Sequence, residues 1–93
     1  MQVEKQTFNL FERLLILLQI PRSEHFLHFD KGKLLRYETP RDFEYSCSNF
    51  YEEVLTNISN IRNKQRLANA AEAFHLLVDN LRVLLKRIFK GHL

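Results

Sequence analysis

Cysteine, glycine and proline are scarce in this 93-residue chain, which has one, two and two of them respectively. Because turns between strands depend on glycine and proline, their scarcity argues against an all-β fold and favours long helices. The lone Cys47 excludes an internal disulfide and a multi-cysteine zinc site, which favours a reducing compartment. It lies between Phe43 and Phe50 at helical spacing, so we expect a small buried hydrophobe rather than a nucleophile.

Long apolar runs are also missing. The densest run, Leu14 to Leu18, is far shorter than the ~20 apolar residues that span a bilayer, so no membrane segment is expected. The first residues include Glu4 and Lys5 and lack the cleavage pattern of a signal peptide, from which we expect a cytoplasmic protein. With 45% hydrophobic and 27% charged residues the composition is globular, and we expect residues 1–93 to form a single helical domain.

The spacing of apolar residues predicts a helix at each end of the chain. The first runs from about Val3 to Ile20, before Pro21, and is apolar nearly all round because Ile16 and Ile20 widen its stripe. The last covers residues 67–90 and carries a heptad. Its predicted seam is Leu67, Ala70, Phe74, Leu77, Leu81, Leu84 and Ile88, widened by Ala71, Val78 and Leu85.

A third helix is predicted between them, with Thr39 as N-cap and Pro40 at its first position. We expect it to run to about Asn60 and to turn near residues 60–65, because its apolar seam is out of phase with that of the last helix. The result is an antiparallel helix hairpin, with a single bent helix as the alternative. Its predicted inward residues are Phe43, Cys47, Phe50, Tyr51, Val54, Leu55, Ile58 and Ile61.

Residues 22–38 allow two interpretations. Either Ser23 caps a short helix through Phe29, or Asp30, Lys31 and Gly32 form a three-residue hairpin loop that pairs Phe29 with Lys33. The predicted fold class is therefore all-α or mainly α. It is a small antiparallel bundle of three long helices, with a short helix or a β-hairpin between the first and second. The hairpin register would place on one face Leu27, Phe29, Leu35 and Tyr37.

Motifs that carry catalysis are absent from the sequence. There is no glycine-rich phosphate loop, nucleophile elbow or HExxH motif. Glu72 and His75 have the Glu-x-x-His spacing of di-iron ligands, but they lie on the helix face opposite Leu67 and Ala70, so we interpret them as surface residues. We therefore expect a protein that is not an enzyme and binds no cofactor or metal.

Positive charge is concentrated in two groups. Residues 80–93 contain no acidic residue, and in an antiparallel hairpin the end of the last helix lies near the start of the preceding one. The two groups would then form one basic patch, suited to the phosphates of nucleic acid. The competing interpretation is a solvated face that compensates the helix dipole. The candidate contact residues are Lys31, Lys33, Arg36, Arg41, Arg82, Lys86, Arg87 and Lys90.

The amount of apolar surface favours a protein-protein contact. Ile16, Ile20, Phe26 and Phe89 add to what a small bundle usually covers. The leading hypothesis is a non-enzymatic helical interaction module that self-associates or serves as an accessory or regulatory subunit, with residues 3–20 and 67–90 as contact surfaces. Its partner would be a second copy or another helical protein. The alternative is a small basic nucleic-acid-binding accessory subunit of a ribonucleoprotein complex.

Overall fold

The computed structural model describes residues 3–22, 26–34, 39–88 and 90, and of Asp30, Lys33 and Ile88 it describes the backbone alone. Its elements are α1 (Val3–Leu18), β1 (Phe29–Asp30), β2 (Lys33–Leu34), α2 (Pro40–Ile58) and α3 (Lys64–Ile88). The prediction of a mainly α fold with three long helices is confirmed. A β-hairpin lies between the first two helices. No helix within the described residues has the length and hydropathy that crossing a bilayer requires.

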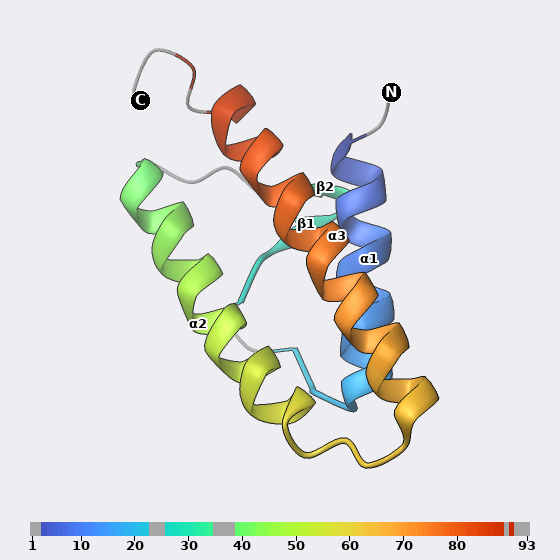
Figure 1. Cartoon of the computed structure of the whole chain (residues 1–93). Helices are drawn as coiled ribbons and strands as arrows, with labels where there is room; N and C mark the ends of the chain where they lie inside the picture. The colour runs from blue at the N-terminus through green and yellow to red at the C-terminus, as the bar shows by residue number, and fades with distance from the viewer. Residues whose placement is uncertain (1–2, 23–25, 35–38, 89, 91–93) are drawn as a thin grey trace.

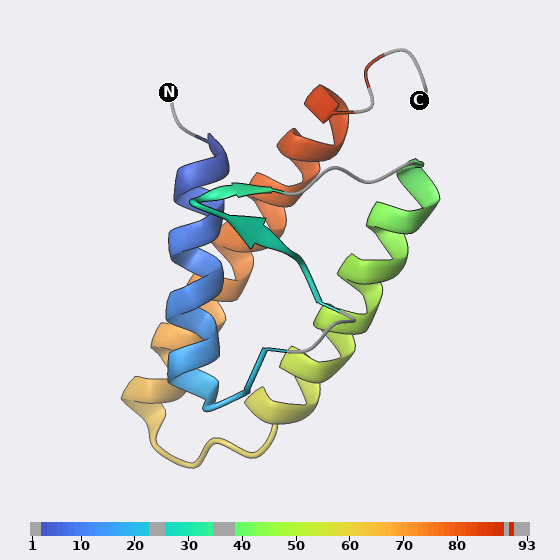
Figure 2. The same ribbon diagram turned by 180° about the vertical axis from the view of Figure 1, so that it is seen from behind.

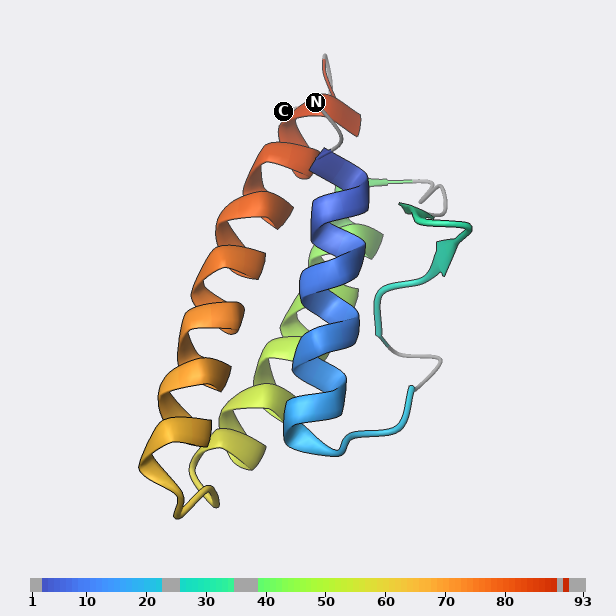
Figure 3. The same cartoon turned by 90° about the vertical axis from the view of Figure 1, so that its right-hand side faces the viewer.

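The helices and the hairpin lie in layers. α1 and α3 pack side by side in opposite directions, while α2 runs antiparallel to α3 and stands further away (Figure 1). The hairpin crosses α1 on the side that faces away from α3 (Figure 2). Seen from the side, α3 and the hairpin therefore flank α1 on its two sides (Figure 3). This arrangement leaves one side of the α1 and α3 pair uncovered by any other described element.

A cluster of phenylalanines joins these layers. The ring centroid of Phe11 on α1 lies 5.4 Å from that of Phe29 on β1 and 5.1 Å from that of Phe50 on α2. Phe26, in the connector between α1 and the hairpin, meets Phe50 edge-on at 5.3 Å. Phe11 and Phe50 are both 0% exposed. Because such ring pairs add to the gain from burial, this cluster stabilises the packing of α2 against α1 and the connector.

α1 ends two residues earlier than predicted, at Leu18. Gln19 adopts a left-handed conformation with φ 56°, and its N–H donates to the carbonyl of Ile16 at 3.2 Å. The N–H of Ile20 donates to the carbonyl of Leu15 at 3.0 Å. These two bonds form a Schellman motif, which brings Ile20 back over the helix. The expectation that Ile20 and Phe26 add exposed apolar surface is therefore wrong, because both are buried.

The hairpin has a two-residue turn, not the predicted three-residue loop. Lys31 and Gly32 both have positive φ, 52° and 80°, as a type I′ turn requires. Phe29 consequently pairs with Leu34, whereas Lys33 pairs with Asp30. Opposite residues share a face of the ladder, so this register places the buried Phe29 and Leu34 together. The predicted pairing would have put a lysine on that face. Leu35 and Tyr37 lie outside the described residues.

One hydrogen bond attaches the hairpin to α1. The N–H of Leu34 donates to the Glu4 carboxylate at 2.8 Å. The bond links residues thirty positions apart and satisfies a backbone donor at the end of the described strand. It also directs the Glu4 side chain toward the hairpin and away from α3.

The start of α2 is as predicted. The hydroxyl of Thr39 accepts a hydrogen bond from the N–H of Asp42 at 3.1 Å, and Pro40 occupies the first turn. Phe43, Cys47, Phe50 and Val54 are buried as expected, whereas Tyr51, Ile58 and Ile61 are half-buried. Leu55 is 57% exposed, and its predicted inward position is wrong. It lies one helical turn after Tyr51, on the side of α2 from which Tyr51 meets Phe74 of α3.

The turn between α2 and α3 falls at residues 59–63, which confirms two helices rather than one. Asn63 caps α3, because its side-chain oxygen accepts a hydrogen bond from the N–H of Arg66 at 2.9 Å. This cap places the helix start at Lys64, three residues before the predicted one. The guanidinium of Arg66 in turn donates from Nε to the carbonyl of Leu17 at 2.8 Å, which ties the start of α3 to the end of α1.

The predicted seam of α3 is confirmed at four buried positions, namely Ala70, Leu77, Leu81 and Leu84. Two alanines differ from the prediction. Ala73 is 1% exposed although it lies outside the heptad, while Ala71 is exposed. The cause is that α3 packs mainly on α1, so its buried stripe is turned toward α1 and not toward α2. The remaining seam and widening residues with described side chains, Leu67, Phe74, Val78 and Leu85, are half-buried.

Candidate interaction surfaces

The structure divides the predicted basic residues. Arg82, Lys86, Arg87 and Lys90 are all exposed on or just after the last turns of α3. Arg41 is exposed at the start of α2, which lies at the same end of the molecule (Figure 1). These five side chains can contribute to one positive electrostatic potential at this end of the molecule.

Lys31 does not join that group. It lies in the hairpin turn, which α1 separates from α3 (Figure 3). Arg36 and the side chain of Lys33 lie outside the described residues. Lys31 therefore lies apart from the cations at the end of α3, because the hairpin folds over α1.

Cys47 lies at a groove of about 230 Å³ between α2 and α3, whose walls include Tyr51, Glu44 and Arg82. The thiol is buried, as the sequence predicted. Burial raises its pKa to about 12, a change that the hydrogen bond with Tyr51 opposes and the Glu44 charge adds to. Burial also raises the pKa of the Tyr51 phenol. Both groups are therefore protonated near neutral pH, and neither is activated as a nucleophile.

We expect the thiol of Cys47 to be protected in the folded protein. A pKa raised from 9.0 to about 12 lowers the thiolate fraction at pH 8 by about a thousandfold, so iodoacetamide should label folded protein far more slowly than urea-unfolded protein. The raised pKa also means that the stability it contributes is complete below pH 9 and is lost as the pH rises toward 12. Thermal melts from pH 8 to 11 should show this loss, and Cys47→Ala should weaken it. Fast labelling of the folded protein at pH 8 would contradict the assignment.

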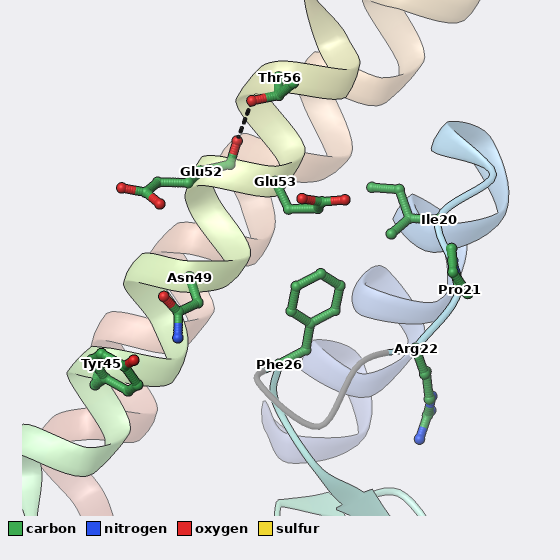
Figure 4. Close-up of a pocket in the computed structure, with 9 residues that line it drawn as sticks. All are labelled: Ile20, Pro21, Arg22, Phe26, Tyr45, Asn49, Glu52, Glu53 and Thr56. Carbon is green, nitrogen blue, oxygen red and sulfur yellow. Dashed lines mark hydrogen bonds between the residues drawn. The ribbon is translucent and has the colours of Figure 1, made fainter.

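A second groove, of about 510 Å³, lies between α2 and the connector that follows α1 (Figure 4). Asn49, Glu52 and Glu53 of α2 form a polar wall, and the ring of Phe26 lies opposite them. Glu52 and Glu53 are exposed. The groove therefore has an acidic wall beside an apolar one.

Arg22 lines the same groove, but its side chain turns away from α2 (Figure 4). Its guanidinium forms an ion pair with Glu12 and lies 5.8 Å and 5.5 Å from the ring centroids of Phe8 and Phe11. Arg22 thus fastens the connector onto α1 and does not neutralise the acidic wall. Within the described residues, no group of three or more His, Cys, Asp or Glu side chains is placed to hold a metal ion.

Two exposed stripes run along α1 and α3, one on each helix, beside the groove that the two helices form. Each follows the alternating three and four spacing of one helix face. The stripe on α1 is Gln6, Asn9, Arg13 and Ile16. The stripe on α3 is Glu72, Leu76, Asp79 and Val83. Together with Leu10 and Asn80, which lie between the stripes, they form what we call the α1/α3 outer face.

The α1/α3 outer face carries three of the large apolar side chains that are exposed in the described part of the chain. Ile16 is 74% exposed, Leu76 44% and Val83 40%. A groove of about 400 Å³ runs between the helices here, lined by Leu10 and Leu76 and by polar residues. Those polar residues are Gln6, Asn9, Arg13 and Asn80. Three of these four polar side chains carry an amide and one, Arg13, carries a charge.

The sequence identified only part of this face. Ile16 is exposed as predicted. The prediction did not include Leu76 and Val83, which lie outside the main heptad of α3. They belong to a second stripe on that helix, with residues three and four positions apart, and this spacing is the sequence signal by which they could have been found. Glu72 and His75 are exposed, as the phase of the heptad predicted, and His75 Nε2 lies 3.8 Å from Asp79 Oδ2.

Comparison with known proteins gives no further guide to the site: no family model, no curated protein and no solved structure matches this chain.

Proposed function

We propose that this protein is a non-enzymatic helical protein-protein interaction module, acting in the cytoplasm through self-association or as an accessory subunit, and that it binds through the α1/α3 outer face. The observation that carries the proposal is the exposure of Ile16, Leu76 and Val83 on that one face. The free buried thiol of Cys47 supports a reducing compartment.

The composition of the face supports this role. The central parts of protein interfaces are depleted in charge and carry apolar groups beside polar groups that can form hydrogen bonds. On the α1/α3 outer face, Gln6, Asn9 and Asn80 surround Leu10 and Leu76. The exposed side of α2 differs, because it carries acidic residues at Glu44, Glu52 and Glu53. Burying the groove between Leu10 and Leu76, which holds the single charge of Arg13, therefore costs less than burying the acidic side of α2.

The test is to compare two leucine variants in affinity purification from cells that express the chain, with nuclease treatment and mass spectrometry. Leu76→Glu places a charge on the α1/α3 outer face, and we expect it to lose a protein partner that the unmodified chain retains. Leu55→Glu is the matched control, because Leu55 is also exposed but lies on α2. Circular dichroism should show both variants folded. Recovery of the same proteins with both variants would contradict the proposal.

A second candidate function rests on the exposed cations at the end of α3. Arg82 and Lys86 lie four residues apart on one side of the helix, Lys90 follows its end, and Arg41 lies at the same end of the molecule. As a nucleic-acid-binding accessory subunit of a ribonucleoprotein complex, the protein would contact phosphates there without reading bases.

Fluorescence anisotropy with a labelled oligonucleotide tests this candidate. The expected result is binding that weakens steeply with salt and is lost when Arg82, Lys86 and Lys90 are replaced by glutamate, whereas Leu76→Glu leaves it unchanged. No binding of RNA or DNA at low salt would eliminate the candidate.

A further inference from the structure

We infer that the α1/α3 outer face binds a second copy of the same chain, in a two-fold symmetric dimer in which α1 of each copy packs across α3 of the other. This inference rests on the proposed function and adds the identity and orientation of the partner. It is carried by the opposite charges of the two stripes, by the matching levels of their residues, and by the size of the face.

The α1 stripe is positive. Its charged member is Arg13, which is exposed. The two acidic residues of α1 are used on the other side of the helix: Glu4 accepts the hydrogen bond from the N–H of Leu34, and Glu12 pairs with Arg22. No carboxylate of α1 therefore offsets the charge of Arg13 on the outer face.

The α3 stripe is negative over the same stretch. Glu72 and Asp79 are exposed there, one on each side of Leu76. His75 lies beside Asp79 at the edge of the stripe. Neither Glu72 nor Arg13 takes part in an ion pair within the described part of the chain. Each copy thus presents a cation on one helix and two anions on the other, which is the pattern that a self-complementary two-fold contact requires.

The levels of the residues match this contact. The bond from Arg66 to the Leu17 carbonyl sets α1 and α3 antiparallel and in register, and Arg13 and Leu76 line the same groove. A two-fold axis parallel to the helices lays α1 over α3 of the partner at the same level. Arg13, four residues before Leu17, is then level with Ala70, four residues after Arg66, in the second copy. Glu72 of that copy lies about two residues, or ~3 Å, further along the axis, within reach of an arginine side chain, whereas Asp79 lies about nine residues, or ~14 Å, away.

The size of the face predicts a weak dimer. α1 has sixteen residues, and at 1.5 Å per residue and two helices in width the face measures about 24 Å by 20 Å, or roughly 1,000 Å² for both copies. Interfaces of that size are at the lower limit for specific complexes, so we expect a dissociation constant on the order of tens of micromolar. At this strength, two like-charge contacts per dimer are enough to weaken association measurably.

Charge exchange between the stripes tests the arrangement. In sedimentation velocity from 1 to 500 µM, we expect Arg13→Glu and the double variant Glu72→Lys/Asp79→Lys each to raise the dissociation constant by roughly tenfold or more, because each places like charges opposite one another. An equimolar mixture of the two should dimerise again, since every pair across the mixed interface is then of opposite sign. Glu52→Lys on α2 is the control and should dimerise like the unmodified chain.

Three results would overturn the inference: an unmodified chain that stays monomeric at 500 µM, charge variants that dimerise normally, or a mixture that fails to associate although circular dichroism shows both variants folded. If the chain is monomeric but Leu76→Glu still loses a partner in affinity purification, this inference is wrong and the proposed function stands. If the chain is monomeric and Leu76→Glu changes nothing, both are wrong.

Discussion

Phe50→Ala is expected to lower the free energy of unfolding by about 3–5 kcal/mol, the usual cost of removing a buried phenylalanine ring. Phe50 is 0% exposed and touches rings from three parts of the chain: Phe11 at 5.1 Å, Phe26 at 5.3 Å and Tyr51 at 6.4 Å. Because α2 stands away from both other helices, few other side chains can move in to fill the space. The loss should therefore be near the upper end of that range.

Chemical denaturation measured by circular dichroism checks this value. A domain of 93 residues has a total stability of roughly 5–14 kcal/mol, so the variant should be close to unfolding at room temperature and its melting temperature should fall by more than ~10 °C. Leu55→Ala is the matched control on the same helix, where 57% exposure predicts a change within about 0.5 kcal/mol. Equal losses for the two variants would show that α2 is not anchored through Phe50.

Ala73→Leu is expected to destabilise the protein by about 1–3 kcal/mol, the cost of forcing extra methylene groups into a packed site. Ala73 is 1% exposed and Ala70 is 0% exposed, on the side of α3 that packs against α1. Small side chains there let the two helix backbones approach closely. A leucine would push α3 away from α1 and stretch the hydrogen bond from Arg66 to the Leu17 carbonyl.

Ala71→Leu provides the control, because Ala71 is exposed two positions away on the same helix. Leucine and alanine have similar helix propensities, so this substitution should change the free energy of unfolding by less than about 0.5 kcal/mol. The pair is informative because the heptad predicts the opposite order, with Ala71 inward and Ala73 outside the seam. A larger loss for Ala71→Leu would mean that α3 is turned toward α2.

The structure separates two contact surfaces that share α3. The α1/α3 outer face uses the middle of the helix, from Glu72 to Val83, whereas the cations begin at Arg82 and continue to Lys90. The effect of a substitution in the middle of α3 can therefore be measured separately from the effect of a substitution at its end. The charge of α3 reverses along its length, acidic at Glu72 and Asp79 and basic after residue 80, and Arg13 is level with the part near Glu72.

Local signals in the sequence were sufficient for most of the helices. The cap formed by Thr39 and Pro40 is made by neighbours in the chain, so it was predictable and is present. The heptad of the last helix and the surface position of Glu72 and His75 follow from the same periodicity. The cap at Asn63 is also made by neighbours in the chain, but it was not predicted because no glycine or proline marks the turn before it.

What the sequence alone determined is the presence and approximate extent of the three long helices, because caps and apolar periodicity act within a few positions of the chain, whereas it left residues 22–38 open between a helix and a hairpin. The tertiary structure decided which apolar residues are covered. Periodicity gives the angular position of Leu55, Ala71 or Ala73 around its own helix. It does not tell on which side of that helix a neighbouring helix packs. Ile20 and Phe26 are buried only because the connector folds over α1 toward α2. Ile16, Leu76 and Val83 are exposed only because no described element covers that side of α1 and α3.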